Sequence, residues 1–157
     1  MNTFIHRRHN RATAVSIAGL LVVLLLPNAA KAFDFRPTPA EWATWSDYCK
    51  ARYAISIVGK TTPYAAMVLP ATAEMWKSRL GWATWEPLHH HCAGLIYMQR
   101  ARLAQTDQRR ISYYRSAKNE SEYTLKRIPP TSLLYREVLA NVQMAQAMLG
   151  VYGTTPL

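Results

Sequence analysis

The sequence has little glycine and only two cysteines. Its 157 residues include 6 glycines, and the two cysteines are Cys49 and Cys92. It lacks a glycine-rich phosphate loop, a G-x-S-x-G elbow and paired carboxylates at helical spacing, and it has no C-x-x-C or C-x-x-C-H motif. These absences argue against phosphate-binding, hydrolase, thioredoxin-like and c-type haem chemistry. We therefore expect a protein that is not an enzyme and that carries no cofactor.

The first 32 residues have the three parts of a secretory signal peptide. A basic stretch, residues 1–11, precedes an uncharged apolar run, residues 12–26, and Ala30-Lys31-Ala32 then offers small residues at the positions that signal peptidase reads. The apolar run has 15 residues, whereas a membrane-spanning helix needs about 20. We predict cleavage before Phe33 and a mature bacterial protein in the periplasm or outside the cell. The alternative is an uncleaved anchor that holds the domain outside the membrane.

Acidic residues are scarce, with 9 Asp and Glu against 19 Lys and Arg. Removing the four basic residues of the leader lowers the net charge from +10 to +6, and most of the remaining surplus lies between Gln99 and Arg127. The predicted basic surface comprises Arg100, Arg102, Arg109, Arg110 and Arg115. Nucleic acid is a poor partner for an exported protein, so an anionic lipid surface, a cell-wall polymer or an acidic protein fits better. The simpler alternative is a solvated helix face.

The two cysteines predict a disulfide. In an oxidising compartment an isolated pair is most simply bonded, and Cys49–Cys92 would close a loop of 43 residues. On the chain-entropy model such a bond is worth roughly 4 kcal/mol.

Strand patterns are absent, and the chain after the leader is typical of an all-α fold. Thr38-Pro39-Ala40-Glu41 has the form of a capping box. The expected helices run from there to about Val58, from about Ala71 to Leu80 with Gly81 as the stop, from Trp85 to about Gln105 with Thr84 as the cap, from a cap at Asp107 to Pro129-Pro130, and from Thr131 or Ser132 to Gly150. Apolar periodicity places Trp42, Trp45, Cys49 and Tyr53 toward the core of the first helix, and Leu134, Val138, Val142, Ala145 and Leu149 toward the core of the last. We predict one helical domain of about five helices over residues 33–150, followed by a loose tail, residues 151–157.

The C-terminal half contains a second pattern. Gly94 and Tyr97 in CAGLIYMQRARLA, followed by Ala117, Leu125 and Pro129 in SAKNESEYTLKRIPP, resemble the small, aromatic, apolar and proline positions of a degenerate tetratricopeptide-type hairpin. EVLANVQMAQAMLG then resembles the first helix of a following repeat. The likeness covers roughly residues 86–150. It departs from the family in an extra turn between Gly94 and Ala117 and in Ser121 at a usually aromatic position.

The combination of DYCKARYA with HHHCAGLIYMQRAR resembles a group of exported bacterial tetratricopeptide-like proteins of uncertain role. This resemblance implies a binding or scaffold part and no chemistry.

Three consecutive histidines, His89, His90 and His91, are the one cluster with metal-binding side chains. On a helix they project about 100° apart, so they cannot all ligate one ion, and the i, i+4 spacing of a helical chelate is absent. A copper or zinc site would need further ligands from another helix. In the structural alternative, Cys92 faces the interior, the imidazoles flank it, and Trp45 or Trp85 covers it.

The sequence therefore predicts a non-catalytic periplasmic module that binds another envelope protein. One alternative is a copper- or zinc-handling protein that uses the histidine cluster. Another, which requires an uncleaved leader, is an anchored accessory subunit of a membrane enzyme complex.

Overall fold

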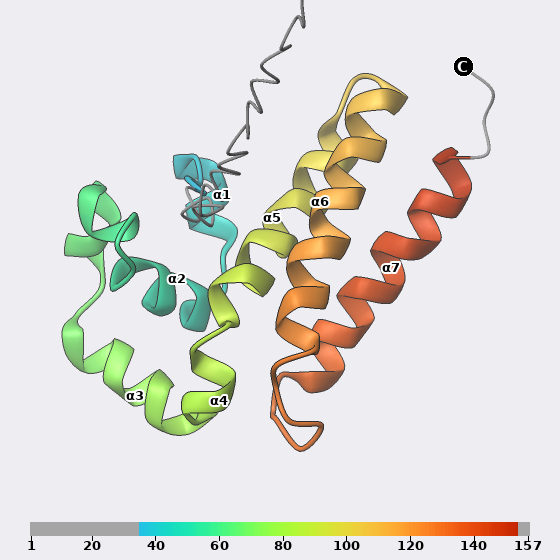
Figure 1. Cartoon of the computed structure of the whole chain (residues 1–157). Helices are drawn as coiled ribbons and strands as arrows, with labels where there is room; N and C mark the ends of the chain where they lie inside the picture. Colours follow the sequence, from blue (N-terminus) through green and yellow to red (C-terminus); the bar gives the residue numbers. More distant parts are fainter. Residues whose placement is uncertain (1–34, 154–157) are drawn as a thin grey trace, which may run out of the picture. The chain divides into compact units, whose positions relative to one another are not determined.

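The computed structural model describes residues 35–153, which belong to one compact unit, Phe33–Leu157 (Figure 1). This part of the chain is helical and contains no strand, so the all-α prediction is confirmed. Its elements are α1 (Pro39–Thr44), α2 (Asp47–Ala54), the 3₁₀ helices η1 (Gly59–Thr61) and η2 (Pro63–Met67), α3 (Pro70–Leu80), α4 (Trp82–Trp85), α5 (Leu88–Leu103), α6 (Asp107–Leu125) and α7 (Tyr135–Gly153).

The predicted capping box opens α1. The side chain of Thr38 accepts a hydrogen bond from the backbone N–H of Glu41 at 3.3 Å, and the Glu41 carboxylate accepts one from the backbone N–H of Thr38 at 2.8 Å. Both amides lie in the first turn, where no carbonyl of the helix can reach them. The box therefore fixes where α1 begins.

The single helix expected from here to Val58 is instead two helices. Trp45 has extended backbone angles, φ −67° and ψ 145°, so α1 ends before it and α2 begins at Asp47. The indole Nε1 of Trp45 donates a 2.9 Å hydrogen bond to the carbonyl oxygen of Cys92, which fixes the tryptophan against α5. Tertiary contact thus overrides helix continuity, although all four predicted core residues are buried: Trp42, Trp45, Cys49 and Tyr53.

The helix expected to begin at Trp85 begins three residues later, at Leu88. A short helix, α4, ends at Trp85, and α5 begins at Leu88, directly after Pro87. The ring of Pro87 clashes with a preceding helical turn, so a helix can start at this proline but cannot run through it. Thr84 was expected to cap this helix but is buried, and its hydroxyl donates to Ser132 Oγ at 2.9 Å. The joint between α4 and α5 is therefore part of the buried core.

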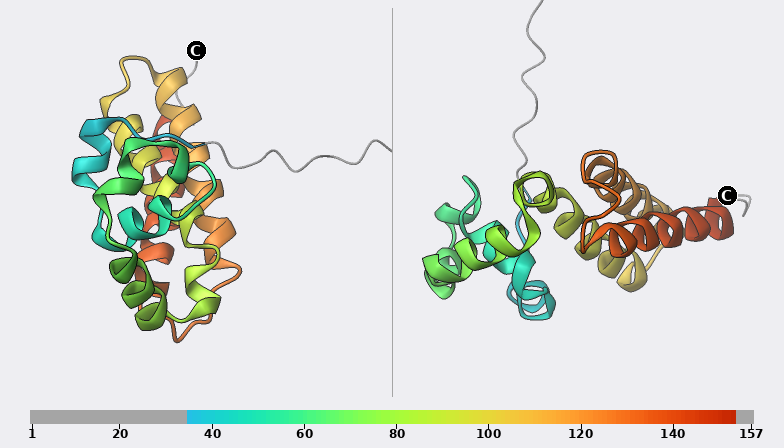
Figure 2. Two further views of the ribbon diagram at one scale, coloured as in Figure 1. Left: turned by 90° about the vertical axis from the view of Figure 1, so that its left-hand side faces the viewer. Right: turned by 90° about the horizontal axis from the view of Figure 1, so that it is seen from below.

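Helices α5, α6 and α7 lie side by side, with α5 and α7 parallel and α6 antiparallel to both (Figures 1 and 2). Thr106, rather than the expected Asp107, caps α6 by accepting from the backbone N–H of Arg109. Helix α7 continues past Gly150, the expected end, to Gly153. Only residues 154–157 of the predicted tail remain, and they lie outside the described residues.

The core has two parts. The larger joins the first half of the chain to α5 and the start of α7 and contains Trp42, Trp45, Cys49, Trp85 and Cys92. The smaller lies among α5, α6 and α7 and contains Met98, Ala101, Tyr114, Ala117 and Ala145.

The predicted leader, residues 1–32, and its cleavage site before Phe33 lie outside the described residues. Within residues 35–153, no helix is both long and apolar enough to cross a bilayer.

Candidate functional site

The disulfide between Cys49 and Cys92 ties α2 to α5, and this prediction is confirmed. The sulfurs are bonded, the two Cα atoms are 5.5 Å apart, and both side chains are buried. Trp45 belongs to the same core cluster, and its indole N–H donates a hydrogen bond to the Cys92 carbonyl. The bond anchors the turn of α5 that carries the three histidines.

His89 is held at the joint between α4 and α5. Its Nδ1 lies 3.1 Å from Nη2 of Arg52 and 3.0 Å from the carbonyl oxygen of Glu86. The same guanidinium donates to the carbonyl oxygens of Trp85 and Glu86, so Arg52 satisfies the end of α4. Burial, and then the charge of Arg52, lowers the pKa of His89 to about 4. The ring is therefore neutral at physiological pH.

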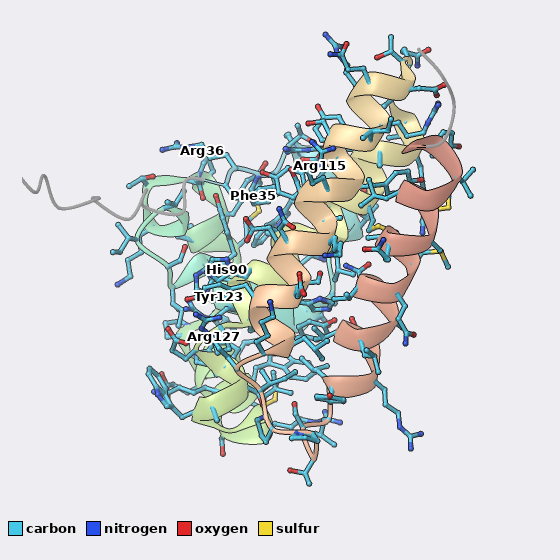
Figure 3. The ribbon with its side chains drawn as sticks, turned by 45° about the vertical axis from the view of Figure 1, so that its right-hand side comes forward. Phe35, Arg36, His90, Arg115, Tyr123 and Arg127 are labelled. Atoms are coloured by element: carbon cyan, nitrogen blue, oxygen red, sulfur yellow. A yellow bond between two sulfur atoms is a disulfide. The ribbon has the colours of Figure 1, made fainter. Side chains whose placement is uncertain are left out.

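His90 points to a different helix. Its Nδ1 lies 2.6 Å from the carboxylate of Glu120 on α6, and its ring packs on Tyr123 with 3.9 Å between centroids. The guanidinium carbon of Arg127 lies 3.4 Å from the centre of the Tyr123 ring. Figure 3 shows the side chains of His90, Tyr123 and Arg127 in a column beside α6.

His91 is fully buried between α5, α6 and α7. Its backbone N–H donates to Thr124 Oγ1 at 3.0 Å, and its Nδ1 lies 3.4 Å from Ser121 Oγ. On the other side, Nε2 lies 3.3 Å from Oε1 of Glu137. Ser121 Oγ in turn accepts a 2.7 Å hydrogen bond from the side-chain amide of Asn141.

Glu137 joins this buried network to the surface. The hydrogen bond from His91 lowers the pKa of Glu137, burial opposes that effect, and a hydrogen bond from Tyr48 adds to it. The pKa of Tyr48 is raised, first by burial and then by Glu137. The phenol therefore stays protonated and donates to an ionised carboxylate.

Ser121, His91 and Glu137 stand in the order of a hydrolase triad. Ser121 is fully buried, however, and its Oγ would lie only 2.3 Å from a Cβ added to Gly94. A substrate cannot reach that oxygen where the helices touch. The arrangement fits a polar contact within the core better than a nucleophile.

The three histidines do not converge. The rings of His89 and His90 contact each other, with 4.3 Å between centroids, but the polar partners of the three histidines differ, as their 100° spacing on a helix requires. Within residues 35–153 there is no group of three or more His, Cys, Asp or Glu side chains that could hold a metal. Copper or zinc binding by His89, His90 and His91 stays a prediction that the described contacts do not favour.

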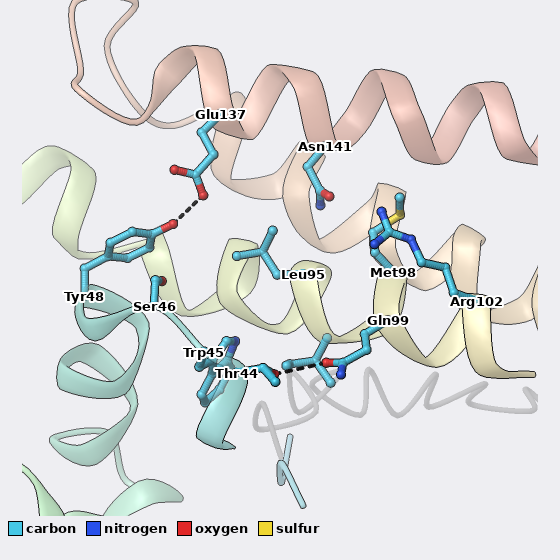
Figure 4. Close-up of a pocket in the computed structure, with 11 residues that line it drawn as sticks. Thr44, Trp45, Ser46, Tyr48, Leu95, Met98, Gln99, Arg102, Glu137 and Asn141 are labelled. Atoms are coloured by element: carbon cyan, nitrogen blue, oxygen red, sulfur yellow. Dashed lines mark hydrogen bonds between the residues drawn. The ribbon is translucent and has the colours of Figure 1, made fainter. Parts of the chain in front are cut away.

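The network ends at a groove between α5, α7 and the α1–α2 joint (Figure 4). Its volume is about 400 Å³. Apolar and polar side chains both line it: Thr44, Trp45, Ser46, Tyr48, Leu95, Ile96, Met98, Gln99, Arg102, Glu137 and Asn141. Glu137 and Tyr48 stand toward one end in Figure 4, and Arg102 stands toward the other.

The predicted basic residues have different surroundings. Arg100 is not a solvated cation: its Nε and Nη2 lie 2.6 and 2.8 Å from the two carboxylate oxygens of Glu41. Arg110 pairs with Asp107 one turn away. The other three are exposed, namely Arg102 at the groove and Arg109 and Arg115 on α6.

Four of the five tetratricopeptide-like positions fall on α5 and α6, the two helices expected to pair. Gly94 of α5 meets α6 closely, since an added Cβ would lie 3.1 Å from the carbonyl oxygen of Ala117. Tyr97 and Leu125 are half-buried beside the core, and Pro129 follows α6 at the surface. The small residues thus allow close packing, while membership in that family stays a prediction.

Sequence reasoning missed Tyr48, Glu137 and Asn141. A signal existed for two of them, because Glu137 and Asn141 are four residues apart and flank the apolar stripe of α7. Polar residues at that spacing beside a buried stripe share one face. Nothing local marked Tyr48, whose partner is 89 residues away.

Comparison of the chain with protein families, with curated proteins and with solved structures finds no match.

Proposed function

We propose that this protein is a non-catalytic binding module that holds a segment of a partner protein in the groove between α5 and α7. The observation that carries the proposal is the groove itself, an open hollow of about 400 Å³. Binding sites are typically concave, largely apolar and furnished with a few polar groups that orient the ligand. This groove has that mixture.

The lining residues suit an extended peptide. Leu95 and Met98 supply apolar contact, while Gln99 and Asn141 supply amide groups that can hydrogen-bond to a peptide backbone. The side chain of Gln99 already accepts from Thr44 at 3.3 Å, which orients its amide nitrogen. Such fixed polar groups reduce the entropy lost on binding.

The ends of the groove carry opposite charges. Arg102 can donate hydrogen bonds to a carboxylate, and ionised Glu137 can accept them from a cationic group. Arg102 is eleven positions after His91, the partner of Glu137, on α5, which corresponds to about 16 Å of helix. Four or five extended residues span that length. A short segment with opposite charges at its two ends would match both.

The leader pattern supports an export role, so the proposed partner is another protein of the bacterial envelope. The hairpin arrangement of α5, α6 and α7 supports a scaffold of tetratricopeptide-like type. Neither point is needed for the groove to bind a peptide.

Selection of displayed peptides on the oxidised full-length protein tests this function. We expect enrichment of short peptides with opposite charges, and we expect Arg102→Glu to weaken their binding about tenfold or more, because an attractive charge becomes repulsive. The matched control is Arg109→Glu, which changes an exposed arginine of α6 outside the groove. Peptides that lose affinity equally in both variants, or in neither, would contradict the proposal.

A further inference from the structure

Exposed apolar side chains gather in one stretch of the chain. Six of the eleven large hydrophobic residues that are exposed among the described residues lie between positions 55 and 82. The most exposed are Ile57 at 89%, Leu69 at 72%, and Met67 and Trp82 at 65% each. Single exposed apolar residues are ordinary, but a concentration of them marks an interaction surface.

These residues belong to one continuous segment of the chain. The segment that carries them, from the end of α2 through η1, η2, α3 and α4, lies away from α6 and α7 in the views of Figures 1 and 2. Helix α3 buries only Ala73 fully, and Met75 is exposed on it. None of this segment lines the groove.

Basic side chains accompany the apolar ones. Residues 55–82 contain Lys60, Lys77 and Arg79 against a single acidic residue, Glu74, which is ion-paired with Lys77 at 3.3 Å. The Lys77 ammonium lies 5.8 Å from the centre of the Trp82 ring, and the Arg79 guanidinium lies 5.2 Å from that of Trp76. Tryptophan beside lysine or arginine is enriched where a protein meets a membrane surface.

A four-residue motif that occurs twice in the sequence distinguishes Trp82 from the other tryptophans. Trp-Ala-Thr-Trp occurs at residues 42–45 and again at 82–85. Trp42, Trp45 and Trp85 are buried, whereas Trp82 is exposed. Trp82 therefore contributes little to the core of this domain.

We infer that this apolar–basic face, comprising Ile57, Met67, Leu69, Met75 and Trp82 with Lys60, Lys77 and Arg79, docks peripherally on an anionic lipid bilayer. The apolar side chains enter the boundary between headgroups and acyl chains, and the cations contact lipid phosphates. Lipid fits better than a folded partner because these side chains stand on short helices and turns rather than around a pocket. A fluid bilayer accommodates separate side chains without matching their shape.

Vesicle binding by the full-length oxidised protein tests the inference. Vesicles of phosphatidylcholine alone are compared with vesicles of equal parts phosphatidylcholine and phosphatidylglycerol, with flotation and tryptophan emission as readouts. We expect binding to the anionic vesicles that weakens as salt is raised, together with a blue shift of the emission. Trp82→Phe should remove most of the shift while retaining binding, because phenylalanine is also apolar.

The conclusion depends on comparing two variants with each other. The apolar run at residues 12–26 is present in both, so any lipid binding by that run cancels in the comparison. Leu69→Asp should weaken binding to anionic vesicles about tenfold or more, since a buried leucine contributes that much or more. Leu69 occupies the N-cap of α3, a position that aspartate favours, so this variant keeps its fold. The control is Met144→Asp, which places the same charge on the exposed side of α7.

Equal binding of Leu69→Asp and Met144→Asp would overturn the inference, as would equal binding to both vesicle types or the absence of an emission shift. A second result would also overturn it: no binding to vesicles, together with dimers in analytical ultracentrifugation that Leu69→Asp abolishes. The face would then be a contact surface for a second copy of the chain.

Discussion

The carboxylate of Glu137 lies 3.3 Å from Nε2 of the fully buried His91. This contact connects the interior of the helical hairpin to the surface of the groove, because Glu137 also lines that groove and accepts a hydrogen bond from Tyr48. The same carboxylate therefore supports the fold and contributes charge to the proposed binding site.

Glu137→Gln should lower the free energy of unfolding by about 1 kcal/mol at neutral pH, because a hydrogen bond to a charged group becomes one to a neutral amide in a partly exposed position. The pKa of Glu137 is lowered in the folded protein, mainly by the hydrogen bond from His91. Its contribution is therefore present above the unfolded pKa, about 4.3, and is lost as the pH falls through the folded pKa. Urea unfolding of both proteins across this acid range measures the difference.

The control for this prediction is Glu74→Gln, which removes an exposed carboxylate paired only with Lys77. We expect its unfolding free energy to stay within about 0.5 kcal/mol of the wild type. Equal effects of the two variants would show that the contact between Glu137 and His91 contributes nothing particular.

His89 should make the protein less stable as the pH falls from about 6.5 to about 4. Burial first, and the nearby Arg52 second, lowers the pKa of His89 to about 4 in the folded state. In that interval the unfolded chain binds a proton that the folded chain does not, so acidification favours unfolding, by on the order of 2 kcal/mol in total. His89→Gln should flatten this part of the pH profile of the melting temperature. A profile identical to that of the wild type would contradict the prediction.

Loss of the disulfide should destabilise the domain by about 3–4 kcal/mol, because the bond closes a loop of 43 residues. Cys49→Ala with Cys92→Ala gives this result without a reductant, and urea denaturation measures it. Adding a reductant to this double variant should change nothing further, whereas it should destabilise the wild type.

The sequence predicted what local patterns and covalent chemistry determine. The capping box at Thr38, the end of α3 at Gly81 with its positive φ of 74° and the bond between Cys49 and Cys92 all follow from residue type and spacing. The apolar stripe of α7 was predicted for the same reason, because its period matches a helix.

The helix break at Trp45 could not be predicted in the same way. It depends on a partner distant in the sequence, because the indole of Trp45 donates to the carbonyl of Cys92. After Trp85 the local signal is Pro87, but Arg52, whose guanidinium donates to the last carbonyl of α4, is distant in the sequence. Propensity alone favours helix through Trp45, but a buried indole N–H needs an acceptor. The groove was missed for a related reason, since it forms only where α5, α7 and the α1–α2 joint meet.

The close approach of α5 and α6 predicts opposite outcomes for two glycine substitutions. In Gly94→Ala the added Cβ would lie 2.3 Å from Ser121 Oγ and 3.1 Å from the Ala117 carbonyl oxygen, and the backbone of α6 cannot yield cheaply. We expect a loss of about 1–3 kcal/mol in unfolding free energy. Gly150→Ala meets nothing within 4 Å and should raise stability by up to about 1 kcal/mol, because alanine favours the helix.

A double variant identifies the cause of the loss at Gly94. Combining Gly94→Ala with Ser121→Gly removes the nearest atom that the new methyl group meets, so the two effects should be less than additive in urea unfolding. Additive losses would show that the helices separate elsewhere, and that the contact between Gly94 and Ser121 does not set their spacing. Because His91 and Asn141 both contact Ser121, the distance between α5 and α6 also positions the polar network beneath the groove. Gly94→Ala should therefore weaken peptide binding in the groove as well as stability, whereas Gly150→Ala should leave binding unchanged.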